Sequence, residues 1–165
     1  MQSLTVEATD VAMRLGAALL CGAVIGINRD LHRKPAGVRT FGLMTLGTAA
    51  LTVALAQYGD PSTIGRAVQG MITGIGFLGA GMIVRPARDN GAVHGLTTAA
   101  AVWLAAALAI LCGLGLVVLA VAVLAVALLL LVLGQPLEEF CAGFFAARDA
   151  ARARRAAARQ PPRGG

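Results

Sequence analysis

The sequence predicts an all-α, polytopic transmembrane bundle of about five helices, and three observations support this fold class. Of the 165 residues, 58% are hydrophobic and only 13% are charged. A soluble domain of this length has too little interior to bury that much apolar surface. The apolar residues also gather in runs close to the roughly 20 residues that a membrane-spanning helix needs. Breaks rich in Gly, Pro and charged residues separate these runs.

The predicted spans differ in how clearly they stand out. The last one is the clearest, because it contains only Leu, Val and Ala. Gly, Thr and Ala dilute the other four, and some are near the short end of the spanning range, so tilt, local bilayer thinning or incomplete crossing stays open. The breaks contain Pro35 and Gly37, then Asp60 and Pro61, and a final Cys-Gly-Leu-Gly turn. The predicted spans are 11–27, 40–57, 67–84, 96–111 and 116–133.

The basic residues predict an orientation. Of the 14 Lys and Arg residues, all but Arg14 and Arg66 lie in the first loop, the third loop or the C-terminal tail. The positive-inside rule therefore places these segments in the cytoplasm and the N-terminus outside. A count of four or six spans would remove this separation of charge. The predicted parts are an extracytoplasmic N-terminus (1–10), a transmembrane domain (11–134) and a cytoplasmic basic tail (135–165).

Small residues recur at the spacing of helix-packing motifs. The pairs are Gly22 with Gly26, Gly70 with Gly74, and Gly76 with Ala80. The third predicted span is the richest in glycine, and each glycine weakens a helix by about 1 kcal/mol relative to alanine. The sequence therefore predicts either very close packing of neighbouring helices on this span or local unwinding beside a buried polar cavity. The glycines concerned are Gly70, Gly74, Gly76, Gly79 and Gly81.

The sequence offers little for catalysis or metal binding. No Asp or Glu lies inside a predicted span, and the three cysteines lack the spacing of a zinc or redox motif. Cys21 and Cys112 are expected to be free, buried thiols. We expect no enzyme activity, no catalytic or metal-ligating residue and no cofactor. The polar residues inside the spans could coordinate a partly hydrated cation, or simply bond to the preceding turn. They are Thr45, Thr48, Thr52, Gln69, Thr73, Thr97 and Thr98.

Two basic segments carry alternative interpretations. In the first loop, Arg29 and Arg39 stand at the membrane edges, where they are either topogenic charges or part of a specific anion or partner site. In the tail, four arginines spaced four, three and four apart form one stripe on a helix. Such a stripe suits anionic lipids, at about 1 kcal/mol per basic side chain; a solvated topogenic tail is the alternative. Nucleic-acid binding is not expected, because no aromatic residues alternate with these arginines. The stripe consists of Arg148, Arg152, Arg155 and Arg159.

Three blocks, in order, resemble the MgtC/SapB family of bacterial inner-membrane proteins. The resemblance covers about residues 22–115. The first block runs from Gly22 through Asn28 and Arg29 to 36–40, the second is 74–81, and the third is 95–100 with Trp103. The Cys-Gly-Leu-Gly turn at 112–115 resembles the turn that follows in the family. The chain departs from the family at Asn28, where Glu is usual.

The resemblance implies a multi-pass inner-membrane protein linked to growth at low magnesium and, in pathogens, to survival in host cells. It implies a short form, since virulence-type members carry a soluble C-terminal domain. Its expected partners are the lipid bilayer, further copies of itself and other membrane proteins, the F-type ATP synthase among them. The motif residues expected to matter are Asn28, Arg29, Gly37, Arg39, Thr40, Gly74, Gly76, Gly79, Gly81, Gly95, Thr97, Thr98 and Cys112.

Two functions follow as hypotheses. The first is a non-enzymatic regulatory or adaptor membrane protein that acts through helix contacts. The second is a small oligomeric transporter or channel for a cation such as Mg²⁺, with a polar path along residues 74–81 and the threonines at 97 and 98. In the predicted topology Arg29, Arg39, Gly81, His94 and Thr97 lie near the same, cytoplasmic, face of the bundle.

Overall fold

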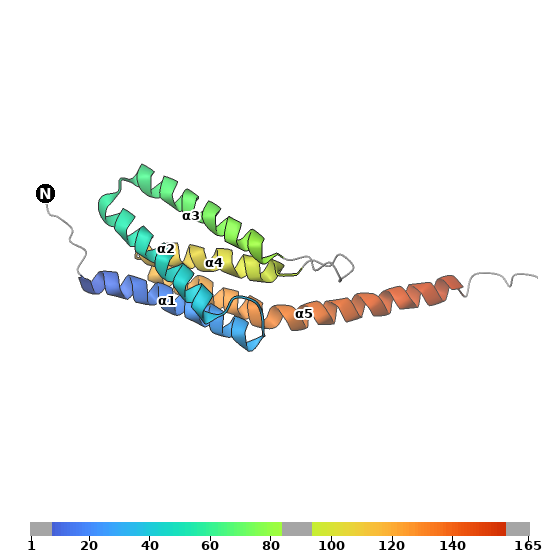
Figure 1. Cartoon of the computed structure of the whole chain (residues 1–165). Coiled ribbons are helices and arrows are strands. Elements are labelled where there is room, and N and C mark those ends of the chain that lie inside the picture. Colours follow the sequence, from blue (N-terminus) through green and yellow to red (C-terminus); the bar gives the residue numbers. More distant parts are fainter. Residues whose placement is uncertain (1–7, 84–93, 158–165) are drawn as a thin grey trace, which may run out of the picture. The chain divides into compact units, whose positions relative to one another are not determined.

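Five α-helices make up the regular structure of the described residues. The computed structural model describes residues 8–83 and 94–157, and Figure 1 shows the helices in chain order. The prediction of an all-α protein with about five helices is confirmed. The helices are α1 (Ala8–Leu31), α2 (Val38–Tyr58), α3 (Pro61–Met82), α4 (Leu96–Gly113) and α5 (Val117–Ala157).

Four helices are long and apolar enough to cross a membrane: α1, α2, α4 and the part of α5 from Val117 to Gly134. The chain is therefore a multi-pass membrane protein by helix length and composition. Helix α3 has 22 residues but is not among the four, because Arg66 and Gln69 dilute its first half. The crossing by α3 stays a prediction, and so does the orientation of the two chain ends, which depends on it.

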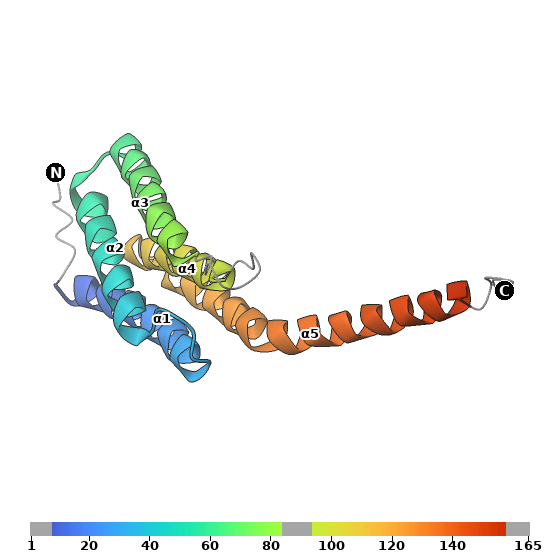
Figure 2. The same cartoon turned by 45° about the vertical axis from the view of Figure 1, so that its right-hand side comes forward.

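Within residues 1–125, which form one compact unit, α1, α2 and α4 each pack against the other two. Helix α3 packs on α4 and, less extensively, on α2 (Figures 1 and 2). The core is built mostly from small side chains, which let the helices approach closely. Its fully buried members include Ala18, Ile25, Phe41, Ala49, Ala105, Ala106, Leu108 and Ala109.

Glycines at two crossings confirm that small residues set the helix distances here. A Cβ atom on Gly26 would lie 2.5 Å from the Val38 Cα, and one on Gly22 would lie 2.8 Å from the Phe41 carbonyl oxygen. At the α2–α4 crossing, a Cβ on Gly113 would lie 2.6 Å from the Thr52 Cβ. The predicted role of the Gly22 and Gly26 pair is therefore confirmed, and it joins the end of α1 to the start of α2.

Of the two expectations for the glycines of the third span, local unwinding is wrong, and within the described residues close packing is seen at Gly79 alone. Helix α3 is continuous from Pro61 to Met82 and is not unwound. No described neighbour lies within 4 Å of the Cβ positions of Gly70, Gly74, Gly76 and Gly81. Only Gly79 approaches another helix, at 3.6 Å from the Ala99 Cβ. Glycine spacing signals the capacity for close packing, and within this chain α3 leaves most of that face open.

The fifth helix continues beyond the predicted span. It passes through Pro136 and ends at Ala157, so the backbone at positions 148, 152 and 155 is helical, as the basic stripe requires. Pro136 removes one backbone donor from the helix. Residues 126–165 form the second compact unit. Arg85 and Arg88, which entered the charge count, and Arg159, the last member of the stripe, lie outside the described residues.

Candidate functional site

The end of the bundle where α1 finishes and α4 starts gathers several residues of the sequence motifs. Arg29, in the last turn of α1, donates a hydrogen bond from Nη2 to the Thr98 hydroxyl in the first turn of α4, at 2.5 Å. The Asp30 carboxylate accepts a hydrogen bond from the Val38 N–H at the start of α2, at 3.0 Å. Residues from the first and third motif blocks therefore meet directly, although 69 positions separate Arg29 from Thr98.

Arg29 is the unusual residue of this end, because a charged side chain is buried there. It is 4% exposed, and Thr98 is 2% exposed. Within the described part of the chain the Arg29 Nε has no hydrogen-bond acceptor, and no carboxylate forms an ion pair with this guanidinium. A buried charge without a partner of opposite sign costs several kcal/mol. The carbonyl end of α1 offsets part of this cost, whereas the amino end of α4 adds to it.

Asp30 and Gly37 build the turn that joins α1 to α2. Val38 is the first residue of α2, so the carboxylate of Asp30 satisfies one of the free N–H groups of that helix from eight residues away. A Cβ atom on Gly37 would collide with this same carboxylate. Arg33 and Ala36 both have left-handed backbone conformations, with φ of 52° and 63°. Such conformations persist in non-glycine residues where the surroundings enforce them.

Gly95, the N-cap residue of α4, lies directly against the end of α3. Its φ of +90° is left-handed, and a Cβ atom there would collide with the Met82 carbonyl oxygen near the end of α3. Both facts require glycine at this position. The last turn of α3 and the first turn of α4 are thus held together, which brings the ends of the second and third motif blocks into contact.

The remaining predicted residues do not share one environment. Asn28 is half-buried, and its backbone carbonyl interacts with the His32 ring at 2.7 Å. Arg39, Thr40 and Thr97 are exposed. Gly79 is buried against α4, while the other motif glycines of the third span lie on the open face of α3: Gly74, Gly76 and Gly81.

Cys112 lies away from this end, deep in the bundle. The structure confirms that it and Cys21 are free, buried thiols. It also shows what the spacing in the sequence did not indicate, since the two thiols are neighbours between α1 and α4.

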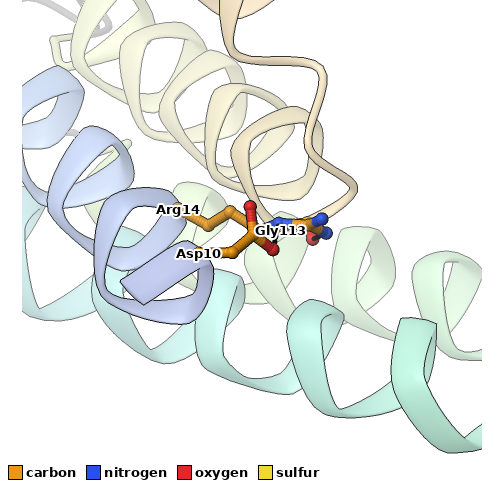
Figure 3. Close-up of polar contacts among 3 residues, drawn as sticks. All are labelled: Asp10, Arg14 and Gly113. Carbon is orange, nitrogen blue, oxygen red and sulfur yellow. Dashed lines mark hydrogen bonds and ion pairs between the residues drawn. The ribbon is translucent and has the colours of Figure 1, made fainter. Parts of the chain in front are cut away.

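Arg14 is a residue whose role the sequence reasoning missed. Its guanidinium forms an ion pair with Asp10 at 2.7 Å and donates a hydrogen bond to the Gly113 carbonyl oxygen at 3.1 Å, as Figure 3 shows. It also packs against Gly115, where a Cβ atom would lie 3.2 Å from the Arg14 Cζ. The spacing of Asp10 and Arg14 by four residues could have suggested the ion pair. Nothing local could have suggested the contact with Gly113.

Three threonine hydroxyls, two of them buried, donate hydrogen bonds within the chain. Thr45 donates to the Phe41 carbonyl at 3.0 Å, and Thr52 donates to the Thr48 carbonyl at 2.8 Å. Thr73, on α3, donates to the Gln69 carbonyl at 2.8 Å. Bonding to the preceding turn, one of the two interpretations drawn from the sequence, is therefore what these three side chains do. Over the described residues, no three His, Cys, Asp or Glu side chains gather as a metal site would require.

Comparisons with known proteins agree with the three motif blocks. The sequence model of the MgtC family matches residues 15–140. Protein SrpB of Synechococcus elongatus is 44% identical over 117 residues, which cover 64% of each chain. Protein MgtC of Salmonella typhimurium is 42% identical over 103 residues, which cover 62% of this chain and 43% of the Salmonella protein. Protein MgtC of Brucella abortus is 39% identical over a stretch covering 62% and 42% of the two chains. No solved structure matches the chain.

Proposed function

Since this chain belongs to the MgtC family, we propose that it is a non-enzymatic regulatory or adaptor protein of the bacterial inner membrane. The proposed role is adaptation to low magnesium or to the interior of a host cell, exerted through helix contacts with membrane partners. The resemblance drawn from the motif blocks is confirmed by the family match. The chain spans about 64% of the SrpB protein and 43% of the Salmonella MgtC protein, so the activity of those whole proteins comes to this chain only as part of the proposal.

The hydrogen bond from Arg29 to Thr98 is the observation that carries this choice over cation transport. A transporter for Mg²⁺ would need oxygen ligands and a negative or neutral path. Here the motif threonine at the start of α4 is held by a buried guanidinium, which would repel a passing cation. Of the glycines along the other part of that path, Gly74, Gly76 and Gly81 lie on the open face of α3, outside the described bundle.

Partners fit this proposal through two surfaces. The open face of α3 displays small residues, which in lipid allow a further helix to approach closely. A second copy of the chain, or another membrane protein such as the F-type ATP synthase, is the proposed occupant. The basic stripe of α5 is proposed to rest on anionic lipids.

Ion flux tests the proposal directly. Purified full-length chain is reconstituted into liposomes that contain a magnesium-sensitive dye, and we expect flux no higher than in protein-free liposomes. In parallel, a bacterium lacking its own copy is grown at low magnesium with the wild-type chain or with Gly76→Leu. Gly76 faces open space, so this change should leave the fold intact while blocking helix approach to α3, and growth should fall. Magnesium flux that Gly76→Leu abolishes would instead favour conduction along α3.

A further inference from the structure

Two sources of positive charge meet where α1 ends and α4 begins. Arg29 is 4% exposed, its Nη2 is bonded to Thr98, and its Nε lacks an acceptor among the described residues. A guanidinium has five N–H donors, and the described residues give this one a single hydrogen bond. No described residue therefore neutralises this charge.

The amino end of α4 adds the second source. Its N-cap is Gly95, which has no side chain to accept a hydrogen bond from the first turn. The first backbone hydrogen bond of the helix joins the Ala99 N–H to the Gly95 carbonyl, so the N–H groups of residues 96, 97 and 98 have no acceptor within the helix. Aligned peptide dipoles place about half a positive charge at such an end. Leu96 is 58% exposed and Thr97 is exposed, so this helix end is open to a ligand.

The loop between α1 and α2 adds no compensating negative charge at this end. Arg33, Lys34 and Arg39 are exposed basic residues. The one acidic residue there, Asp30, uses its carboxylate on the Val38 N–H and sits against Gly37. The described residues therefore leave this end of the bundle with an excess of positive charge, and its most buried member is Arg29.

We propose that the start of α4, backed by Arg29, is a binding site for a phosphate-type oxyanion. Such an anion carries several acceptor oxygens, enough to take the free N–H groups of the first turn and the Thr97 hydroxyl together. It would also neutralise the guanidinium that lies behind Thr98, through charge-assisted bonds that are stronger than neutral ones. The phosphate can belong to a lipid headgroup or to free phosphate, since both present the same oxygens. This site does not depend on the regulatory role proposed above.

Unfolding of the full-length chain in a phosphate-free maltoside detergent gives the test, with the fluorescence of Trp103, the single tryptophan, as the probe. One arm adds potassium phosphate against potassium chloride of equal ionic strength. The other adds phosphatidylglycerol against a galactolipid that has no phosphate. We expect one of the two phosphates to raise the unfolding temperature. A response to inorganic phosphate identifies a free anion, whereas a response to phosphatidylglycerol alone identifies a lipid.

The variants separate binding from general charge. Arg29→Met should weaken the response by about tenfold or more in apparent affinity, and Arg29→Lys should weaken it less. Lys34→Met removes one exposed charge from the same end and should leave the response unchanged. If Arg29→Met does not fold, Thr98→Val with the ¹⁵N signal of the Arg29 Nε as readout replaces it, and phosphate should shift that signal in the wild type.

Three results would overturn the site. They are the absence of any response to both phosphates, an equal response in Arg29→Met, and a non-additive loss of stability when Asp89→Asn is combined with Arg29→Met. Asp89 is an acidic residue of the segment between α3 and α4 that lies outside the described residues. The last result would show that a carboxylate of the chain itself neutralises Arg29.

Discussion

Helix α1 carries two arginines that face the two ends of the same neighbour, and their surroundings are opposite. Arg14 and Arg29 are separated by about 22 Å along the helix axis. Arg14 lies at the carbonyl end of α4, where it bonds to the Gly113 oxygen and pairs with Asp10. Arg29 lies at the amino end of α4, and among the described residues its one hydrogen-bond partner is the Thr98 hydroxyl.

As a consequence, Arg14 stabilises the folded bundle, whereas Arg29 destabilises it. At the carbonyl end of a helix a positive charge is favourable, and at the amino end it is unfavourable. Arg14 also has a carboxylate within 2.7 Å, so its charge is neutralised locally. A protein that keeps a buried, poorly paired arginine at the costly end keeps a group whose contribution lies outside folding, which is why we place the binding site there and not at Arg14.

The largest effect on stability should come from disturbing the close contact between α1 and α2 next to Arg29. Gly26→Ala places a Cβ 2.5 Å from the Val38 Cα, so the backbone must shift, at a cost of about 1–3 kcal/mol. Gly16→Ala is the matched control on the same helix near Arg14, where nothing lies within 4 Å. It should be neutral or stabilising by up to about 1 kcal/mol. Unfolding in detergent, followed by circular dichroism, measures both, and equal losses would show that Gly26 is not a close contact.

Replacing Arg14 and replacing Arg29 should change the free energy of unfolding in different directions. Arg14→Met loses an ion pair and a hydrogen bond to a helix carboxyl end, and we expect a loss of about 1–3 kcal/mol. Arg29→Met removes a buried, unneutralised charge, so in phosphate-free detergent it should be neutral or stabilising. The same unfolding measurement compares them. A loss in Arg29→Met as large as that in Arg14→Met would mean that the two ends are equally structural.

The sequence could predict that helices of this chain cross closely, but not which glycines do so. Gly22 and Gly26 meet α2, whereas Gly70 and Gly74, at the same spacing, meet nothing described. A pair of glycines at this spacing indicates that another helix can approach the backbone closely. It does not indicate whether that helix belongs to the same chain. In the same way Arg29 and Arg39 look alike in the loop, and only the tertiary structure shows that Arg29 is buried and Arg39 exposed. The contact of Arg14 with Gly113 spans 99 positions, beyond any local pattern.

Between the two arginines, α1 and α4 are in contact at Cys21 and Cys112, and this contact can be trapped. In a Cys141→Ser background, mild oxidation with diamide should join the two thiols into a disulfide, because they are neighbours between α1 and α4. Thermal stability should change little. The product is read as a mobility shift on a non-reducing gel after cleavage in the loop between α2 and α3. Cys112→Ser is the control that must remove the shift. Its persistence, or no cross-link at all, would contradict the packing of α1 on α4 on which the comparison rests.

The smallest effect belongs to Asp60, which caps α3 at the same end of the bundle as Arg14. Its carboxylate accepts from the Ser62 hydroxyl and the Thr63 N–H, both at 2.7 Å, and these bonds hold the pKa of Asp60 below its ordinary value of 3.8. Because the folded-state pKa is the lower one, the stabilisation is complete above the ordinary value and is lost as the pH falls through the lowered pKa. A ¹³C-carboxyl titration of the chain in detergent should show this depressed midpoint. Asp60→Asn keeps an acceptor for the cap but cannot titrate, so it should remove this component of the acid sensitivity. At the start of α4 the N-cap residue is Gly95, which has no side chain to supply a cap of this kind.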